Sequence, residues 1–318
     1  MDALWIMLKN VLIFVGLALP GYILVKAKFI KTGESAVLSK ILSYVGMPFL
    51  ILSSVLNIEF TASFIKIALI TAFAFIFLTV LIFFVSRVLT AKESDEKKRG
   101  VMRFAMTFAN NGFLGIPLAM AVFNNTVVVS LVVFINIFNN ILIYTLGLYL
   151  VSNDKKVISF KKAFFNPVVI VFILGIILNL VGINKTVPEV LVFSDYLKNI
   201  VTPLSMIILG VKLADLPIKE LFTSTVSYYL SFIKLIVIPV VAVAFGFAVK
   251  YAFNLPIDLL YAFFIAFAMP TATLGTTFAD QYNGDTKTSA ICTLGSTCLS
   301  VLTIPLLYYI LNLIITQI

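Results

Sequence analysis

Two apolar stretches of the chain are interrupted by clusters of residues that break helices. The first cluster reads Ala109-Asn110-Asn111-Gly112-Phe113-Leu114-Gly115-Ile116-Pro117, and the second reads Met269-Pro270-Thr271-Ala272-Thr273-Leu274-Gly275. Proline and glycine interrupt the helical hydrogen-bond ladder, so backbone amides and carbonyls are freed inside a hydrophobic segment. Hydrocarbon cannot satisfy those groups, whereas a water-lined or ligand-lined cavity can. A matched pair of such breaks therefore predicts a binding site at membrane mid-depth.

A helix that restarts after such a break has the chemistry of an anion site. Its first amides have no intrahelical acceptor, and the macrodipole leaves partial positive charge at that end. Two such ends at one depth favour a carboxylate guest. The alternative is a pair of independent proline kinks tolerated by neighbouring helices. The candidate binding residues at the breaks are Asn110, Asn111, Gly112, Gly115, Ile116, Pro117, Pro270, Thr271, Ala272, Thr273 and Gly275.

Polar stripes on two further apolar stretches add candidates. Asn136, Asn139 and Asn140 recur at i, i+3 and i+4, which places them on one face of a helix. We interpret this face as lining a cavity, although amides also join helices within lipid. A similar stripe of hydroxyl side chains comprises Thr293, Ser296, Thr297 and Ser300. The favoured role of this second stripe is to join helices.

Lys234 is the charged candidate, because it lies among apolar neighbours shortly before Pro239. A lysine at this depth faces protein or a cavity, where it counters the charge of a bound anion or titrates. Snorkelling of the side chain to the interface is the alternative.

Several kinds of chemistry have no residues to support them. The chain contains no His, and no Asp or Glu is expected near mid-depth, so a carboxylate proton relay or a multi-carboxylate sodium site is poorly supported. The sequence shows no P-loop, no metal-ligand cluster and no nucleophile–base pair. We therefore predict a protein that is not an enzyme and uses no cofactor or metal.

The composition is that of a polytopic membrane protein. The 318 residues are 61% hydrophobic and only 12% charged, and the mean hydropathy is +1.12. Average usage in soluble proteins is about 25% charged residues. The net charge of +9 is therefore attributed to topology and anionic lipid, with no nucleic-acid partner.

Ten apolar runs are long enough to cross a bilayer. They lie at about 3–26, 36–56, 64–90, 101–123, 126–151, 165–184, 188–213, 223–250, 256–280 and 285–315. Lysine and arginine concentrate in every second loop, between runs 1 and 2, 3 and 4, 5 and 6, and 7 and 8. The positive-inside bias places those loops in the cytoplasm and both termini on the extracellular or periplasmic side of the cell membrane.

Two halves of five spans each would then have opposite orientations. Their landmarks agree: Gly46-Met47-Pro48 in the second run corresponds to Val201-Thr202-Pro203 in the seventh. The interval from Pro48 to Pro117 also resembles that from Pro203 to Pro270. The sequence predicts an all-α fold of ten transmembrane helices in two inverted five-helix repeats, residues 1–151 and 165–318, joined by a basic cytoplasmic loop at 152–164.

The same residues resemble the auxin efflux carrier family over essentially the whole chain. The most specific match is Asn110-Asn111-Gly112-Phe113-Leu114-Gly115-Ile116-Pro117-Leu118, which is similar to the family signature of the fourth span. Weaker matches are Pro270-Thr271-Ala272, Gln281-Tyr282, Ser296-Thr297-Cys298-Leu299-Ser300, Lys234-Leu235-Ile236-Val237-Ile238-Pro239, and Pro203 followed by Leu209-Gly210 and Leu213. Asn111 and Thr273 depart from common family residues, which bears on the substrate. The chain lacks the long cytoplasmic loop of plant members and resembles compact prokaryotic ones.

The resemblance implies a fold like that of bile acid:sodium symporters, in which spans 4 and 9 cross at the substrate site. Spans 1, 2, 6 and 7 would form a scaffold, often dimeric, and spans 3–5 and 8–10 a moving transport domain. Family substrates are organic anions. Asn110 and Asn111 would contact the substrate, and Pro117 and Pro270 would be the crossover prolines.

The sequence thus predicts a secondary carrier, with efflux the favoured direction, that moves small organic anions such as carboxylates by elevator-type alternating access. The expected partners are the anion, the lipid bilayer and a second copy in a homodimer. An anion channel or substrate sensor with the same cavity is one alternative, and a sodium-coupled organic anion symporter is another.

Overall fold

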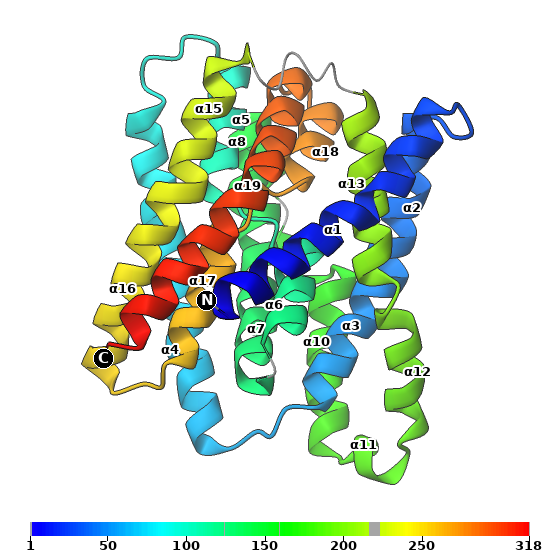
Figure 1. Ribbon diagram of the computed structural model, residues 1–318, viewed down its shortest axis with the longest axis vertical. Helices are drawn as coiled ribbons and strands as arrows, with labels where there is room; N and C mark the ends of the chain where they lie inside the picture. Colours follow the sequence, from blue (N-terminus) through cyan, green and yellow to red (C-terminus); the bar gives the residue numbers. More distant parts are fainter. Residues whose placement is uncertain (1, 124, 159, 216–222, 318) are drawn as a thin grey trace.

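The computed structural model describes residues 2–123, 125–158, 160–215 and 223–317, and these residues are almost entirely helical (Figure 1). The helices of the first half are α1 (Asp2–Lys26), α2 (Ser35–Ile41), α3 (Met47–Leu56), α4 (Ala62–Leu89), α5 (Glu96–Thr107), α6 (Ile116–Val122), α7 (Thr126–Leu142), α8 (Leu148–Ser152) and α9 (Phe160–Phe164). Those of the second half are α10 (Pro167–Leu180), α11 (Ile183–Thr186), α12 (Glu189–Lys198), α13 (Val201–Asp215), α15 (Thr225–Phe232), α16 (Ile238–Phe253), α17 (Asp258–Ala268), α18 (Leu274–Gln281) and α19 (Thr286–Ile315).

Seven helical segments in the described ranges are long and apolar enough to cross a membrane. They are Trp5–Lys26, Thr32–Leu56, Ala62–Leu89, Thr126–Ser152, Glu189–Ala214, Thr225–Phe253 and Thr286–Ile315. The fourth, sixth and ninth predicted spans hold shorter apolar helices, Asn111–Val122, Pro167–Leu180 and Asp258–Ala268. Breaks divide the fourth and ninth spans, which is why their helices are short. The protein is a multi-pass, helical membrane protein.

Four turns of π-helix interrupt the helices of the described ranges, namely η2 (Leu42–Gly46), η3 (Asn111–Gly115), η4 (Ile143–Gly147) and η6 (Ile233–Val237). Three of them stand just before Pro48, Pro117 and Pro239, each the second residue of the next helix. A proline cannot donate to the carbonyl four residues earlier, and its ring clashes with that carbonyl. The residue before each proline instead bonds five residues back, as Ile116 does to Asn111. The prolines thus account for the widened turns.

The helices form two packed sets, on the right and left of Figure 1. In one set α1 packs against α13, and α3 packs against α10 and α12. In the other, α4 packs against α5 and α7, α16 against α17, and α19 against α5, α15 and α18. Helix α1 also contacts α6 and α19, which joins the sets.

Glycines allow the closest approach between α1 and α13. A Cβ atom at Gly210 would collide with the carbonyl oxygen of Ala18, and one at Gly21 would collide with that of Ile207. Such backbone-to-backbone contact between small residues is a principal source of helix association in lipid.

Helix α17 lies at the centre of the core. Its residues from Leu259 to Ala268 are buried apart from the partly exposed Tyr261, and the rings of Phe263, Phe264 and Phe267 are among the largest buried side chains. A helix that is apolar on all sides requires such a position. The helix ends at Ala268 because Pro270 disfavours a helical conformation at Met269, which is extended.

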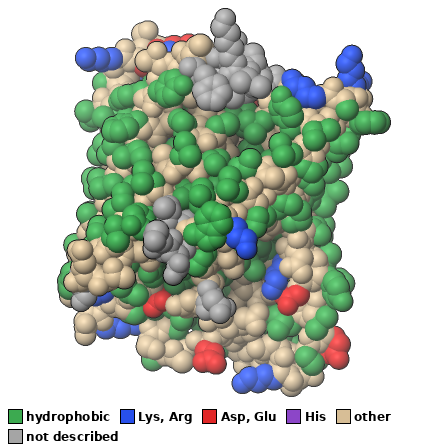
Figure 2. Space-filling view, in the orientation of Figure 1, with side chains coloured by type: hydrophobic (Ala, Val, Ile, Leu, Met, Phe, Trp, Pro, Cys, Tyr) green, Lys and Arg blue, Asp and Glu red, His purple; other side chains and the backbone are tan. Residues whose placement is uncertain are grey.

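The surface matches a membrane environment. In Figure 2 hydrophobic side chains cover the middle of the visible face, and charged side chains gather at the upper edge and in the lower half.

The loop between α4 and α5 lies at the upper end, which we call the basic end, and the loop between α3 and α4 lies at the opposite end (Figure 1).

Candidate functional site

The two helix breaks of the sequence lie side by side. Helix α5 ends at Thr107 and α17 ends at Ala268, and the extended residues that follow form an antiparallel bridge between Ala109 and Thr271. The Asn110 amide donates to the Pro270 carbonyl at 2.8 Å, and the Ala272 amide donates to the Phe108 carbonyl at 3.0 Å. We call these residues, 108–110 and 269–273, the paired breaks.

Neighbouring side chains satisfy other polar groups of the paired breaks. The Thr271 hydroxyl donates to the Ala105 carbonyl at the end of α5, at 3.0 Å, and the Thr271 amide donates to the Ser296 hydroxyl at 3.1 Å. The Asn139 side chain donates to the Ala109 carbonyl at 3.2 Å. The break therefore has a fixed conformation, because buried backbone groups that hydrocarbon would leave unpaired have protein partners.

A cavity of about 160 Å³ borders the paired breaks. Its walls come from η2 and α3, from the two breaks, from α7 and η4, and from the start of α10. The lining residues are Ser43, Tyr44, Met47, Ala109, Asn110, Asn111, Gly112, Phe113, Asn136, Asn139, Asn140, Ile143, Tyr144, Asn166, Pro167, Val168, Ala272, Thr273 and Leu274. None of these residues carries a formal charge at neutral pH. We call this space the asparagine cavity, after the six asparagines in its wall.

Two asparagines in this wall have unused hydrogen-bonding groups. Asn111 is fully buried, and neither its Oδ1 nor its Nδ2 has a hydrogen-bond partner among the described residues. The Nδ2 of Asn136 is likewise buried and unpaired. Leaving a buried polar group unpaired costs about 1–3 kcal/mol. Three such atoms at one cavity indicate a site that is completed by a guest.

The restarting helices add a favourable potential for an anion. η3 begins at Asn111 and α18 begins at Leu274, and neither start is capped by the side chain of the residue before it. The Leu114 and Gly115 amides donate to the Asn110 carbonyl and the Gly275 amide to the Ala272 carbonyl, while the amides before them precede the first such bond. Each helix presents its positive dipole end there. Both starts border the asparagine cavity. The arrangement can hold negative charge without a basic side chain.

The structure brings eight of the predicted site residues into the cavity wall: Asn110, Asn111, Gly112, Asn136, Asn139, Asn140, Ala272 and Thr273. The remaining seven, Gly115, Ile116, Pro117, Lys234, Pro270, Thr271 and Gly275, do not line it. Three of these seven contribute to the breaks instead. Pro270 and Thr271 form the pairing, and Gly115 approaches the Met269 side chain. Lys234 stands apart on η6, fully buried.

The sequence profile of the family described as membrane transport protein matches residues 6–308, nearly the whole chain. The chain belongs to this family. It is the auxin efflux carrier family that the span-4 motif resembles. The family comprises membrane transporters and is not a family of enzymes.

Two archaeal members of the family are similar to this chain. An uncharacterized transporter of Methanocaldococcus jannaschii is 26% identical over 312 residues, covering 95% of this chain and 97% of the relative. An uncharacterized transporter of Methanothermobacter thermautotrophicus is 26% identical over 215 residues, covering 67% of this chain and 68% of the relative.

Four polar residues in the cavity wall of this membrane transport protein were not predicted: Ser43, Tyr44, Tyr144 and Asn166. Tyr144 continues the stripe of Asn136 and Asn140 at the helical period, so an extended stripe would have included it. Asn166 is the N-cap of α10, where its Oδ1 accepts from the Val169 amide at 3.0 Å. An Asn-Pro pair is a recognisable helix-start signal. No sequence pattern indicated Ser43 and Tyr44, because only tertiary packing brings η2 to the cavity.

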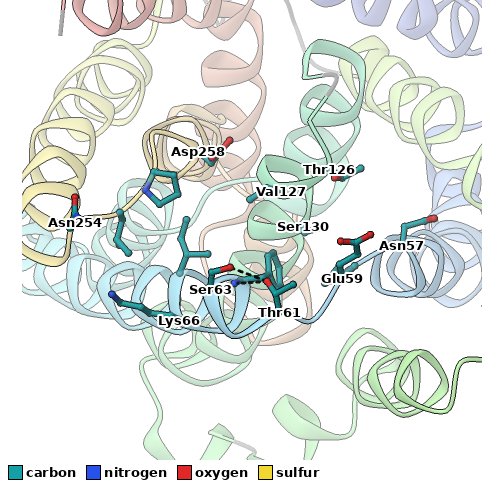
Figure 3. Close-up of a pocket in the computed structure, with 15 residues that line it drawn as sticks. Asn57, Glu59, Thr61, Ser63, Lys66, Thr126, Val127, Ser130, Asn254 and Asp258 are labelled. Atoms are coloured by element: carbon teal, nitrogen blue, oxygen red, sulfur yellow. Dashed lines mark hydrogen bonds between the residues drawn. The ribbon is translucent and has the colours of Figure 1, made fainter.

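A second, larger cavity of about 570 Å³ lies at the end opposite the basic end (Figure 3). Its polar wall includes Glu59 from the loop after α3, Lys66 from α4, and Asp258 at the start of α17. The Asn125 side chain donates to Asp258 Oδ1 at 2.6 Å. Figure 3 shows Glu59 and Asp258 on different elements around the opening. Because the predicted topology places this end outside, we call this space the outer cavity.

Proposed function

We propose that this protein is a secondary carrier of small organic anions, with carboxylates as the substrate class and the asparagine cavity as the binding site. The observation that carries the proposal is Asn111, whose side-chain amide is fully buried, unpaired and placed at the start of a broken helix. Its Nδ2 would donate to a carboxylate oxygen, as would the backbone amides of Gly112 and Leu274 at the starts of η3 and α18. A charged acceptor strengthens such hydrogen bonds roughly twofold over neutral ones.

The dimensions of the asparagine cavity favour a small substrate. Its volume is about 160 Å³. Pockets for drug-sized molecules occupy about 300–1,000 Å³. We therefore propose a mono- or dicarboxylate of a few carbon atoms as the substrate.

The apolar layer between the two cavities favours a carrier over a channel. Helix α7 contributes Ser130 to the outer cavity and Asn136 to the asparagine cavity. Between them, Leu131, Val132, Val133 and Ile135 are fully buried. A channel needs a continuous polar path, whereas alternating access needs a site that opens to one side at a time.

The proposed movement is that of an elevator. In this proposal the set of α1–α3 and α10–α13 is the scaffold, and the set of α4–α8 and α15–α19 is the transport domain. The proposal includes two inverted repeats, 1–151 and 165–318, around the connecting loop at 152–164, and crossing of the fourth and ninth spans at mid-membrane. It also includes a homodimer in the cell membrane, with both termini outside and with efflux as the physiological direction.

Exchange assays in proteoliposomes test this function. Vesicles loaded with unlabelled acetate, malonate, succinate, malate or citrate would take up the matching labelled acid by counterflow, which requires no driving gradient. The carrier proposal predicts saturable exchange for at least one acid and no single-channel conductance in planar bilayers. Absence of exchange for every acid would argue against the substrate class, and stepwise conductance would favour the channel.

A further inference from the structure

Lys234 is a buried cation that the asparagine cavity does not use. It is 1% exposed, its Nζ has no hydrogen-bond partner among the described residues, and it does not line the cavity. Ser227, Ser231 and Lys234 share one face of α15 and η6, and all three are buried. This face turns inward: a Cβ atom at Gly295 of α19 would collide with the Ser227 hydroxyl. Snorkelling therefore does not describe this lysine.

The π turn that carries Lys234 packs against the two helices that end at the paired breaks. η6 packs against α5, α17 and α19, as well as α15 and α16. Helices α5 and α17 end at the paired breaks, and the last carbonyls of a helix carry partial negative charge. The paired breaks thus present positive helix ends to the asparagine cavity, while η6 packs against the two helices whose negative ends meet there.

The side chains on the five helices that pack against η6, namely α5, α15, α16, α17 and α19, do not neutralise an ammonium at Lys234. Their titratable groups away from the helix ends are Arg103, Tyr228, Tyr229, Tyr261, Cys292, Cys298, Tyr308 and Tyr309. Arg103 is the one charged group among them, and its Nε donates to the Thr90 hydroxyl. The charged residues at the ends of these elements are Glu96, Lys97, Lys98, Arg99, Lys250, Asp258 and Lys287. Within the described ranges, none of them makes an ion pair with Lys234.

We propose that Lys234 is a proton-binding site coupled to the anion site across the paired breaks. An ammonium buried without a counter-charge is costly, and an anion bound at the opposite helix ends reduces that cost. Conversely, the ammonium offsets the partial negative charge at the ends of α5 and α17, and that charge opposes anion binding. Proton and anion binding therefore reinforce each other, and linkage requires the two effects to be equal. The carrier would move one proton with each anion, and the proton resides on Nζ during transfer. This inference rests on the proposed function.

Proton uptake on anion binding tests the coupling without any substitution. A pH dye in weakly buffered detergent solution would report the protons taken up when an acid identified by the exchange assay is added. The proposal predicts uptake of a fraction of a proton up to one per anion, varying with pH. Exchange without any proton uptake between pH 6 and 9 would overturn the coupling and leave the carrier function intact. Absence of exchange would instead contradict the carrier function.

Two substitutions locate the proton. Lys234→Met keeps the length of the side chain without its charge, and we expect it to weaken anion affinity about tenfold or more and to abolish proton uptake. Lys234→Arg keeps a permanent charge, and we expect exchange to persist while transport driven by a pH gradient at zero membrane potential is lost. Lys40→Met, at an exposed position in α2, is the control and should change neither property. Should Lys234→Met fail to fold, the Arg variant alone decides, because pH-driven transport that survives in it would overturn the assignment.

Discussion

The backbone amide of Asn110 donates a 2.8 Å hydrogen bond to the carbonyl of Pro270, although the two residues belong to opposite halves of the chain. With the bond from Ala272 to Phe108, it pairs two helix breaks that would each be unfavourable alone. The pairing places the starts of η3 and α18 at one cavity. The site therefore depends on contacts that keep the breaks together.

Asn139→Ala should destabilise the protein more than Asn140→Ala. The Asn139 amide is the side-chain partner of the buried Ala109 carbonyl, and its loss leaves that group unpaired, at a cost of about 1–3 kcal/mol. Asn140 donates only to Asn136, within its own helix. Thermal unfolding of the purified variants measures the difference. Equal or greater destabilisation by Asn140→Ala would contradict the role given to Asn139.

Gly275→Ala should cost more stability than Gly115→Ala. A Cβ atom at Gly275 would lie 2.5 Å from Cε1 of Phe104, whose ring is buried against Phe108 and Phe278. Relieving that overlap should cost about 1–3 kcal/mol. At Gly115 the nearest atom is Cγ of Met269, at 3.3 Å, and a methionine can adjust. Unfolding temperatures that ranked the two variants in the opposite order would show that the Phe104 ring moves aside easily.

Gly210→Ala should separate α1 from α13, because the added methyl would run into the Ala18 carbonyl. Gly16→Ala on α1 is the control, since no atom lies within 4 Å of its Cβ position. We expect a lower unfolding temperature and loss of monodispersity in detergent for Gly210→Ala, and wild-type behaviour for Gly16→Ala. A stable Gly210→Ala protein would mean that this backbone contact is dispensable.

Proline and glycine made the helix breaks predictable. Met269 to Gly275 was predicted as the second break, and the structure has α17 ending at Ala268 and α18 starting at Leu274. At the first break the chain leaves the helix earlier, at Phe108, and Pro117 lies inside α6, because the π turn η3 absorbs the missing proline donor. Helix propensities describe single residues. They therefore predicted where the helix would break but not the π turn η3 that follows.

Predictions that depended on the neighbours of a residue were less complete. The stripe of Asn136, Asn139 and Asn140 was predicted from the helical period, which determines which residues share a face, and the three residues line the asparagine cavity. Lys234 was predicted to face protein or a cavity, and the structure buries it outside the cavity wall, which the sequence could not specify. That position follows from the packing of η6 against α5, α17 and α19, which involves segments far apart in the chain.

The most direct test of the central claim is the affinity of the exchanged carboxylate for the wild type and for Asn111 variants, measured by titration calorimetry. We predict that Asn111→Ala weakens binding about 10- to 100-fold, because hydrogen bonds to a charged group are worth about 1.5–3 kcal/mol. The variant should be no less stable than the wild type, since the amide has no protein partner to lose. Asn111→Asp, which adds negative charge, should abolish binding, and Asn10→Ala on α1 should leave it unchanged. Wild-type affinity in Asn111→Ala would contradict the assignment of the asparagine cavity as the anion site.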